Sequence, residues 1–447
     1  MTQPSDTRSI YGPQVKGATD RTVRRMRSSA AVSAYQKEWI TNLQDRASHG
    51  EPIVYMIGDS PIAEIFEAMD IPTVVGAWWS AMIVTKRLSS FYGEMADKNS
   101  AGFFGPEYDE FGPCARCVGG AQILAQDPEH APYGGLPKLS AIISREGGCL
   151  GTAKANELEL HQLKRRGFDV PVFNFQQLGT PPYNPRYPRW WERINEHWDE
   201  VVEPYKVDYV LEELKALIKF LETTTGKNLN QNRLMTALEL SNEQNMYWKK
   251  ARDLIAETVP CPVDFNDQFA SYPAQWHRGT PEARDLIKMF YEEVKEKVDN
   301  GEVVCPDEKL RLAWVRGRPL AGDNAFYQYF EKPYKAVFVC GMILSIGADS
   351  YYRRAINGDP LRAIASRLVF LGIYSGPDWT IKDEKQHKVS GAMMYESTCP
   401  MTTWTGHLQT KLTHEAAGIP MLILKPDWDA ERLRAEASRF IEERLLT

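Results

Sequence analysis

The chain has 447 residues, of which 43% are hydrophobic and 25% are charged, and its formal net charge is −6. This composition is that of an ordinary globular protein with two or three domains, and it gives no reason to expect a nucleic-acid-binding protein. No segment approaches the roughly 18–20 apolar residues of a membrane span, and the first residues lack the apolar core of a signal peptide, so we expect a cytoplasmic protein that does not bind membranes.

Seven cysteines in a chain of this size, without a sign of export, do not suggest a disulfide framework. Burial as a small apolar residue is the default for each of them. Where a cysteine has a special role, metal binding or catalysis is the better expectation.

The first two hundred residues alternate between strand and helix patterns, which is typical of a parallel sheet. An amino-terminal helix is predicted over residues 21–47, lying over the first domain, and the Trp78-Trp79 pair begins another. The stretch from 178 to 189 is rich in proline and too irregular for a core element. Strands are predicted at 53–57, 71–75, 139–144 and 170–175.

The middle of the chain is helical, and the strand rhythm then returns. Leucine and isoleucine at helical spacing predict helices over 205–254, broken at Thr225-Gly226-Lys227-Asn228. Residues 260–281 resemble a linker, and a further amphipathic helix covers 282–298. Later strands are predicted at 312–315, 336–340, 389–395 and 421–424, before a closing helix over 430–446.

These patterns predict an α/β protein of two similar lobes with parallel, Rossmann-like sheets. We divide it into an amino-terminal helical extension (1–50), a first lobe (51–200), a helical middle segment (201–305) and a second lobe (306–447). A site is expected in a cleft between the lobes, because open α/β sheets bind ligands beyond the carboxyl ends of their strands.

Two cysteines stand at such strand ends. Cys149 follows the apolar strand 139–144 and the turn Gly147-Gly148, and a helix begins after it. Cys399 follows the strand 389–395 in the same way, with Pro400 suited to a first helical turn. Backbone N–H groups and the helix dipole at these positions favour a thiolate, the form that binds metal or acts as a nucleophile.

A third thiol is available from the pair Cys114-Ala115-Arg116-Cys117. One CxxC is ambiguous, since zinc, redox and iron–sulfur proteins all use it. Three converging thiolates are too few for a closed zinc or iron–sulfur site and leave one metal position open. An iron–sulfur cluster with an open iron is one hypothesis; a plain redox or zinc CxxC protein is another.

Several motifs together resemble the 2-hydroxyacyl-CoA dehydratase and benzoyl-CoA reductase family. The resemblance runs from about residue 52 to residue 443, and it depends on the order and spacing of the motifs rather than on any one of them. They are DSPIAEIFEAMDIP (59–72), Gly-Gly-Cys149 with its helix, LIKFLE (217–222) with Thr225-Gly226-Lys227, Leu234, Ser241-Asn242, and EST-Cys399 with Gly418-Ile419-Pro420 and Pro426-Asp427.

The resemblance implies one 4Fe-4S cluster per chain, held by three cysteines with one open iron, and an oxygen-sensitive subunit of an anaerobic radical enzyme. It implies a heterodimer with a homologous iron–sulfur subunit and a separate ATP-hydrolysing activator that supplies electrons. Cys149 and Cys399 match two ligand positions. The first ligand falls at Cys114 or Cys117, where this chain departs from a Cys-x-x-x-Arg pattern. We favour Cys117.

The family contains two reactions on acyl-CoA thioesters. Reductases pass electrons into the ring of benzoyl-CoA, and dehydratases remove water from a 2-hydroxyacyl-CoA through a ketyl radical. Chain length and the Trp78-Trp79 pair favour the benzoyl-CoA reductase type, with the dehydratase as the alternative. A double-cubane reductase, which would need Cys340, Cys305 and Cys261 as further ligands, and a non-catalytic electron-transfer partner subunit are further alternatives; Cys261 and Cys305 are expected in surface connections.

Four other residues are candidates for the site. Glu64, after the first strand, is a candidate proton-transfer carboxylate, against the alternative of a solvated helix face. His407, on the helix after Cys399, is a second candidate proton donor, against a structural role. Trp78 and Trp79 are candidates for the wall of an aromatic acyl pocket, against ordinary core packing.

Overall fold

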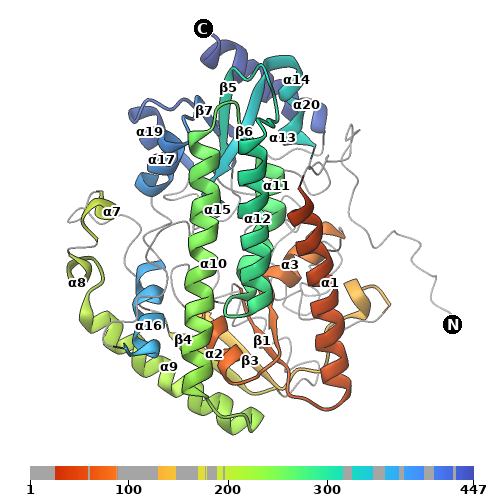
Figure 1. Cartoon of the computed structure of the whole chain (residues 1–447), viewed down its shortest axis with the longest axis vertical. Coiled ribbons are helices and arrows are strands. Elements are labelled where there is room, and N and C mark those ends of the chain that lie inside the picture. Colours follow the sequence, from red (N-terminus) through yellow and green to blue (C-terminus); the bar gives the residue numbers. More distant parts are fainter. Residues whose placement is uncertain are drawn as a thin grey trace, which may run out of the picture.

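Two parallel four-stranded sheets flanked by helices form the protein (Figure 1), so the predicted α/β fold with two lobes is confirmed. The computed structural model describes residues 26–58, 61–86, 88, 129–146, 170–176, 178, 189–194, 197–315, 325–345, 358–371, 377–396, 407–425 and 429–447. All eight strands in this described part of the chain coincide with strands predicted from the sequence. They are β1 (Val54–Met56), β2 (Thr73–Val75), β3 (Ala141–Glu146), β4 (Val172–Gln176), β5 (Leu310–Trp314), β6 (Ala336–Gly341), β7 (Gly391–Tyr395) and β8 (Met421–Leu424).

The two sheets share one topology. The first has the order β2-β1-β3-β4 and the second the order β6-β5-β7-β8, so each half of the chain places its second strand outside its first and its third and fourth strands on the other side. Every pairing is parallel. The carboxyl ends of all four strands in a sheet therefore lie at one edge, where α/β proteins bind ligands.

Long helices connect the two sheets (Figure 1). Helix α9 (Pro204–Thr225) has proline in its first turn and ends at Gly226, whose φ of +70° is the left-handed conformation that glycine adopts most readily. Helix α10 (Gln231–Glu257) begins at Asn230, whose side chain accepts a hydrogen bond from the Arg233 N–H at 3.0 Å. The predicted helical segment and its break are thus confirmed.

Helix α10 packs along α12 (Pro281–Asp299). Trp248 of α10 is fully buried and stacks on Phe290 of α12, with 5.4 Å between the ring centroids. The indole N–H of Trp248 donates to the carbonyl of Leu344, just beyond β6, at 3.0 Å. The middle helices are therefore packed directly against the second sheet.

Two helices pack across the predicted domain boundaries. Helix α1 (Arg27–Ser48) contributes Val32 to the core around the second sheet and Leu43 to the core around the first sheet, so it covers more than the first lobe. Helix α16 (Pro360–Phe370) lies in the second half of the chain but packs on α9 and joins the first sheet's apolar cluster. The boundaries between domains stay predictions.

The stretch from 260 to 281 is not a linker. It folds as α11 (Phe265–Ser271) and the short helix η2 (Tyr272–His277), and its side chains are largely buried. Asp264 caps α11, since its side chain accepts from the Asp267 N–H at 2.9 Å. Proline and polar residues suggested a linker, but here they form caps and buried hydrogen bonds.

Shorter helices complete the two halves. Among the helices that the structure describes, none is long and apolar enough to cross a membrane. The remaining helices are α2 (Ala63–Ala68), α3 (Gly76–Thr85), η1 (Pro132–Gly134), α7 (Trp190–Arg193), α8 (Trp198–Val201), α13 (Phe326–Tyr329), α14 (Glu331–Tyr334), α15 (Met342–Ser345), α17 (Pro377–Gln386), α19 (His407–Ala416), α20 (Ala430–Phe440) and the π-helical turn η5 (Ile441–Leu445).

Candidate functional site

The contacts of α10 show how the two sheets face each other. At its start, the N–H of Asn230 donates to the carbonyl of Ala68, at the end of α2 and hence beside the amino end of β2. At its other end, the guanidinium of Arg311, in the first residues of β5, donates to the carbonyl of Ala256 at 3.2 Å. Helix α10 thus runs from the amino edge of one sheet to the amino edge of the other.

The carboxyl edges lie between these two points. Ala237 and Glu64 both border Gly279, because a Cβ on that glycine would lie 3.1 Å from Cβ of Ala237 and 3.4 Å from Cγ of Glu64. Glu64 is in the first turn of α2, just past β1. The indole N–H of Trp248 donates a hydrogen bond to the carbonyl of Leu344, just past β6. Positions 237 and 248 are eleven residues apart, or about 16 Å along a helix, so the two carboxyl edges face each other across this part of α10.

The two edges are built on one backbone plan. The N–H of Ile57, after β1, donates to the carbonyl of Ile143 in β3 at 2.9 Å, and the N–H of Val315, after β5, donates to that of Met393 in β7 at 2.8 Å. Strand register agrees, since Met56 pairs with Ile143 and Trp314 pairs with Met393. Ile143 and Met393 are therefore equivalent positions in the two halves.

The two predicted ligand cysteines are the same number of residues beyond these equivalent positions. Cys149 is six residues beyond Ile143, and Cys399 is six residues beyond Met393. Both cysteines, like Cys114 and Cys117, lie outside the described residues. What the structure describes is the pair of strands that lead to them, β3 and β7, at facing edges.

Two glycines shape these edges in the same way. An added Cβ on Gly76, after β2, would lie 2.7 Å from the carbonyl oxygen of Met56. An added Cβ on Gly341, at the end of β6, would lie 2.7 Å from the carbonyl oxygen of Trp314. In each sheet the second strand thus turns into a helix so close to the end of the first strand that only glycine fits.

Glu64 is completely buried at the first edge. The alternative that it lies on a solvated helix face is therefore wrong. Glu67, one turn later, is about 41% exposed and pairs with Arg233, so the solvated alternative suits Glu67 better. A buried carboxyl at the carboxyl edge of a sheet is placed where an acid or base would act, and its role in proton transfer stays a prediction.

The positions of the three other candidate residues, Trp78, Trp79 and His407, do not test their predicted roles. Trp78 and Trp79 are both fully buried in the apolar cluster around the first sheet, with 6.0 Å between their rings. They begin α3 at the carboxyl edge, and their part in a substrate pocket stays a prediction. His407 is the first residue of α19, and its side chain lies outside what the structure describes.

The three described thiols belong to the core around the second sheet. Cys261 and Cys305 are 0% and 5% exposed, so their predicted placement in surface connections is wrong. Burial raises the pKa of Cys261 to about 12, and its Sγ donates to the carbonyl of Val263 at 3.1 Å. Burial also raises the pKa of Cys340 well above its usual value. Cys261 and Cys340 are thus placed as protonated thiols, and Cys305 lies in the same packed core, which gives the double-cubane alternative no support.

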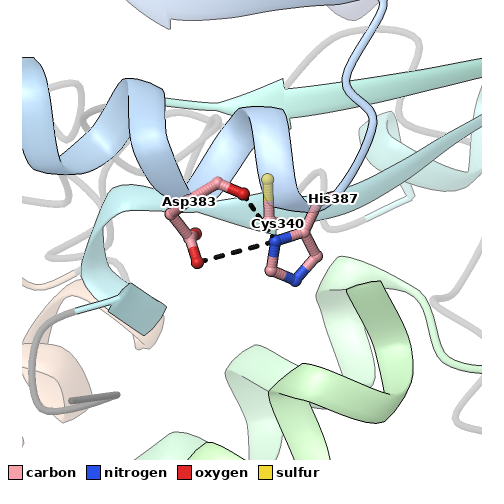
Figure 2. Close-up of side chains that lie close together, drawn as sticks. All are labelled: Cys340, Asp383 and His387. Atoms are coloured by element: carbon pink, nitrogen blue, oxygen red, sulfur yellow. Dashed lines mark hydrogen bonds and ion pairs between the residues drawn. The ribbon is translucent and has the colours of Figure 1, made fainter. Parts of the chain in front are cut away.

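Cys340 lies beside Asp383 and His387, with the nearest donor atoms of the three within 4.8 Å of one another (Figure 2). The imidazole Nδ1 contacts the backbone carbonyl of Asp383 at 2.8 Å, which requires the proton on Nδ1. The Asp383 carboxylate pairs with Arg252 at 2.6 Å. Burial of the ring lowers the pKa of His387 to about 4, so it is neutral. Since Nδ1 of His387 and the Asp383 carboxylate already have protein partners, we assign this cluster a structural role.

Sequence reasoning missed Arg252, although it left a signal. Arg252 follows Trp248 by four residues, so it occupies the apolar face of α10, and it is only 2% exposed. A charged residue at an apolar position indicates a buried partner elsewhere in the chain.

A cavity of about 160 Å³ lies between α1, α2, β2 and η2, lined by residues that include Trp39, Glu67 and His277. Ligand pockets usually measure about 300–1,000 Å³. This cavity also lies beside the edge strand β2 rather than between the sheets, so we do not assign it to a large substrate.

Comparison with known proteins gives one family match over most of the chain. The family model described as 2-hydroxyglutaryl-CoA dehydratase, D-component, matches residues 63–443. The chain is also similar to two curated proteins. One is the (R)-2-hydroxyisocaproyl-CoA dehydratase alpha subunit of Clostridioides difficile, 27% identical over 123 residues, which are 27% of this chain and 30% of that protein.

The other is the (R)-phenyllactyl-CoA dehydratase alpha subunit of Clostridium sporogenes, 30% identical over 116 residues, which are 26% of this chain and 28% of that protein. The chain thus matches less than a third of the length of these curated relatives.

Proposed function

Because this chain belongs to the 2-hydroxyglutaryl-CoA dehydratase D-component family, we propose that it is the iron–sulfur subunit of an enzyme that removes water from a 2-hydroxyacyl-CoA thioester. The sequence favoured benzoyl-CoA reduction, on chain length and the Trp78-Trp79 pair. The two curated relatives are both named as dehydratase subunits, and both tryptophans are fully buried. We therefore adopt the dehydratase, which was the alternative.

One observation carries the cofactor part of the proposal. Cys149 and Cys399 stand six residues beyond register-equivalent positions of β3 and β7, on sheets whose carboxyl edges face each other. Two thiolates approaching one centre from equivalent places suit a shared inorganic cluster, with Cys117, or Cys114 in its place, as the third ligand. A 4Fe-4S cluster on three thiolates would supply single electrons and an open iron for a substrate oxygen.

The chain's own acids have a separate task. Elimination of water needs a proton to reach the departing hydroxyl group and another to leave the neighbouring carbon. Glu64, completely buried at the first carboxyl edge, is our candidate for one of these transfers, and His407 is a second. A homologous partner subunit and an ATP-hydrolysing activator complete the proposed enzyme.

Iron and sulfide analysis of the anaerobically purified chain tests the cofactor. We expect about four irons per chain, and loss of them in Cys149→Ser and Cys399→Ser. Cys340→Ser is the matched control, because it removes a thiol of the same fold that we assign to packing. Zinc alone, or equal iron in all variants, would end the proposal; eight irons would favour a double cubane.

Activity then separates the reactions. With partner subunit, activator and ATP present, we expect turnover of a 2-hydroxyacyl-CoA and none of benzoyl-CoA. Glu64→Gln should retain its iron while losing at least about a hundredfold in rate, the usual contribution of acid–base catalysis. Full activity in Glu64→Gln would show that Glu64 does not transfer a proton in the reaction, and it would leave the proposal of a cluster unaffected.

A further inference from the structure

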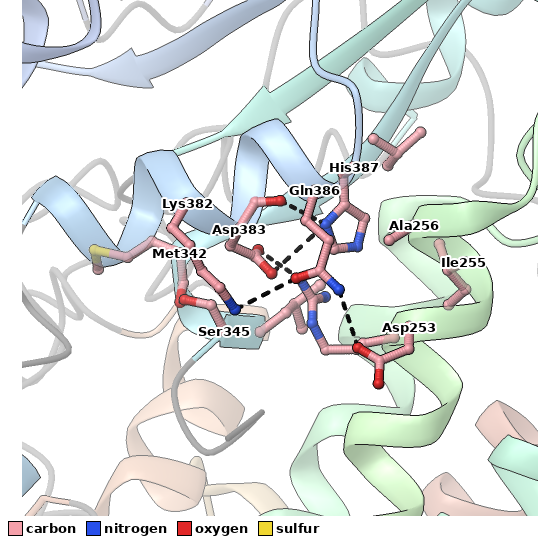
Figure 3. A network of polar contacts seen from close by, with 12 residues as sticks. Asp253, Ile255, Ala256, Met342, Ser345, Lys382, Asp383, Gln386 and His387 are labelled. Atoms are coloured by element: carbon pink, nitrogen blue, oxygen red, sulfur yellow. Dashed lines mark hydrogen bonds and ion pairs between the residues drawn. The ribbon is translucent and has the colours of Figure 1, made fainter. Parts of the chain in front are cut away.

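Five charged residues meet where α10 lies beside α17, three of them positive (Lys249, Arg252, Lys382) and two negative (Asp253, Asp383). Figure 3 shows Asp253, Lys382 and Asp383 of this group. Arg252 pairs with Asp383 at 2.6 Å. Asp253 pairs with Lys249 and also accepts from Nε2 of Gln386 at 3.1 Å. Both carboxylates are thus engaged by other groups, and the fifth residue, Lys382, is left as an excess positive charge.

Lys382 has unused hydrogen-bonding capacity. Within the described part of the chain it forms no ion pair, and its one hydrogen bond is a long one of 3.4 Å to Oε1 of Gln386. Its ammonium lies 4.4 Å from the ring centroid of Trp379, a cation–π contact. The residue is partly buried, and burial lowers its pKa. Because the side chain is only partly buried, the remaining N–H donors of this ammonium can reach an anion from solution.

The position of Lys382 is that of a ligand-binding residue. The indole N–H of Trp379 donates to the carbonyl of Ser345 at 3.2 Å, and Ser345 ends α15, directly beyond β6. Trp379 also stacks on Trp190 of the first half of the chain, with 5.0 Å between their ring centroids. Lys382 therefore lies about one helical turn from the second carboxyl edge, near the place where the two halves meet.

We propose that Lys382 binds a phosphate group at the nucleotide end of the CoA thioester substrate. The inference rests on the proposed acyl-CoA function. An ammonium is a compact charge whose donors suit phosphate oxygens, and phosphate would neutralise the excess charge of the network. Free phosphate shares this chemistry, so the test includes it.

The experiment measures ligand binding to the full chain, purified anaerobically with its partner subunit. Lys382→Met keeps an unbranched side chain over Trp379 and removes the charge. Lys385→Met is the matched control, because Lys385 is exposed on the same helix. Isothermal titration compares a 2-hydroxyacyl-CoA, the same acyl group on pantetheine, which lacks the nucleotide, and inorganic phosphate.

We expect Lys382→Met to weaken binding of the CoA thioester by about tenfold or more, the effect of losing one charge-assisted contact, and to change binding of the pantetheine thioester by less than about twofold. Lys382→Arg should recover part of the loss, and Lys385→Met should match the unchanged chain. Circular dichroism establishes that each variant is folded.

Equal weakening of the CoA and pantetheine thioesters, or no weakening of either, would overturn the assignment. Phosphate binding as tight as that of the CoA thioester would also overturn it, by showing a general anion site. If the unchanged chain binds no CoA thioester, the proposed function itself fails. If the unchanged chain binds a CoA thioester and Lys382→Met binds it equally well, only the proposed role of Lys382 fails.

Discussion

Arg311 fixes the end of the helix that spaces the two carboxyl edges, so its removal should be costly. It is 4% exposed and donates to the carbonyls of Ala256 at 3.2 Å, His387 at 2.9 Å and Thr258 at 2.6 Å. Its Nε pairs with Glu308 at 2.9 Å, and that carboxylate is 2% exposed. Arg311 thus supplies the donors that the end of α10 lacks.

Arg311→Met keeps most of the volume but leaves a buried carboxylate without its cation. Breaking a buried ion pair from one side usually costs about 3–5 kcal/mol, and the freed carbonyls add to this. We therefore expect the free energy of unfolding to fall by about 4 kcal/mol in urea titrations followed by circular dichroism. Glu308→Gln should cost less, because the amide still accepts from the guanidinium.

The double variant tests the reasoning. If the pair acts as a unit, the Arg311→Met, Glu308→Gln chain should lose about 1–3 kcal/mol less than the sum of the single variants. Additive losses, or a loss below about 1 kcal/mol for Arg311→Met alone, would mean that Arg311 does not anchor α10. The cluster iron of a folded variant should be unchanged, since Arg311 lies at the amino edge of its sheet and the cluster is proposed at the carboxyl edges.

Two further predictions follow from the same packing. Burial lowers the pKa of His387 to about 4, so between pH 6.5 and 4 only the unfolded chain binds a proton at this residue. The free energy of unfolding should therefore fall by about 1.4 kcal/mol for each pH unit as the pH drops through this window. This dependence on pH should be shallower in His387→Asn than in a variant of the exposed His49. Gly76→Ala and Gly341→Ala each place a Cβ 2.7 Å from a strand carbonyl oxygen, and each should lower the free energy of unfolding by more than about 2 kcal/mol in urea titration. Gly418 has open space around it, so Gly418→Ala should lower it by only about 1 kcal/mol. Equal losses at the three glycines would contradict the close approach.

The strands were predictable because apolar runs bounded by turns carry their own signal, and Gly226 marked the end of α9 for the same local reason. The stretch 260–281 was misassigned because its signal is not local: Gln268 is fully buried, and its amide reaches the carbonyl of Val339, 71 residues away. Lys382 and Arg252 were missed for the same reason, since the balance of charge around them depends on which helices meet.

The two halves of the chain repeat the same backbone hydrogen bonds. Ser140 donates its N–H to the carbonyl of Ile53, just before β1, and Ser390 donates its N–H to the carbonyl of Arg311, near the start of β5, both at 2.7 Å. The backbone plan is therefore shared down to single hydrogen bonds, yet the side chains at the two edges differ.

The first edge carries the buried carboxyl of Glu64, and near the second lies the ammonium of Lys382, which forms no ion pair within the described part of the chain. A duplicated scaffold would supply the proposed cluster ligands Cys149 and Cys399 from equivalent positions in the two halves. If Glu64 transfers a proton and Lys382 binds the nucleotide phosphate, as we propose, the substrate has only one orientation that reaches both.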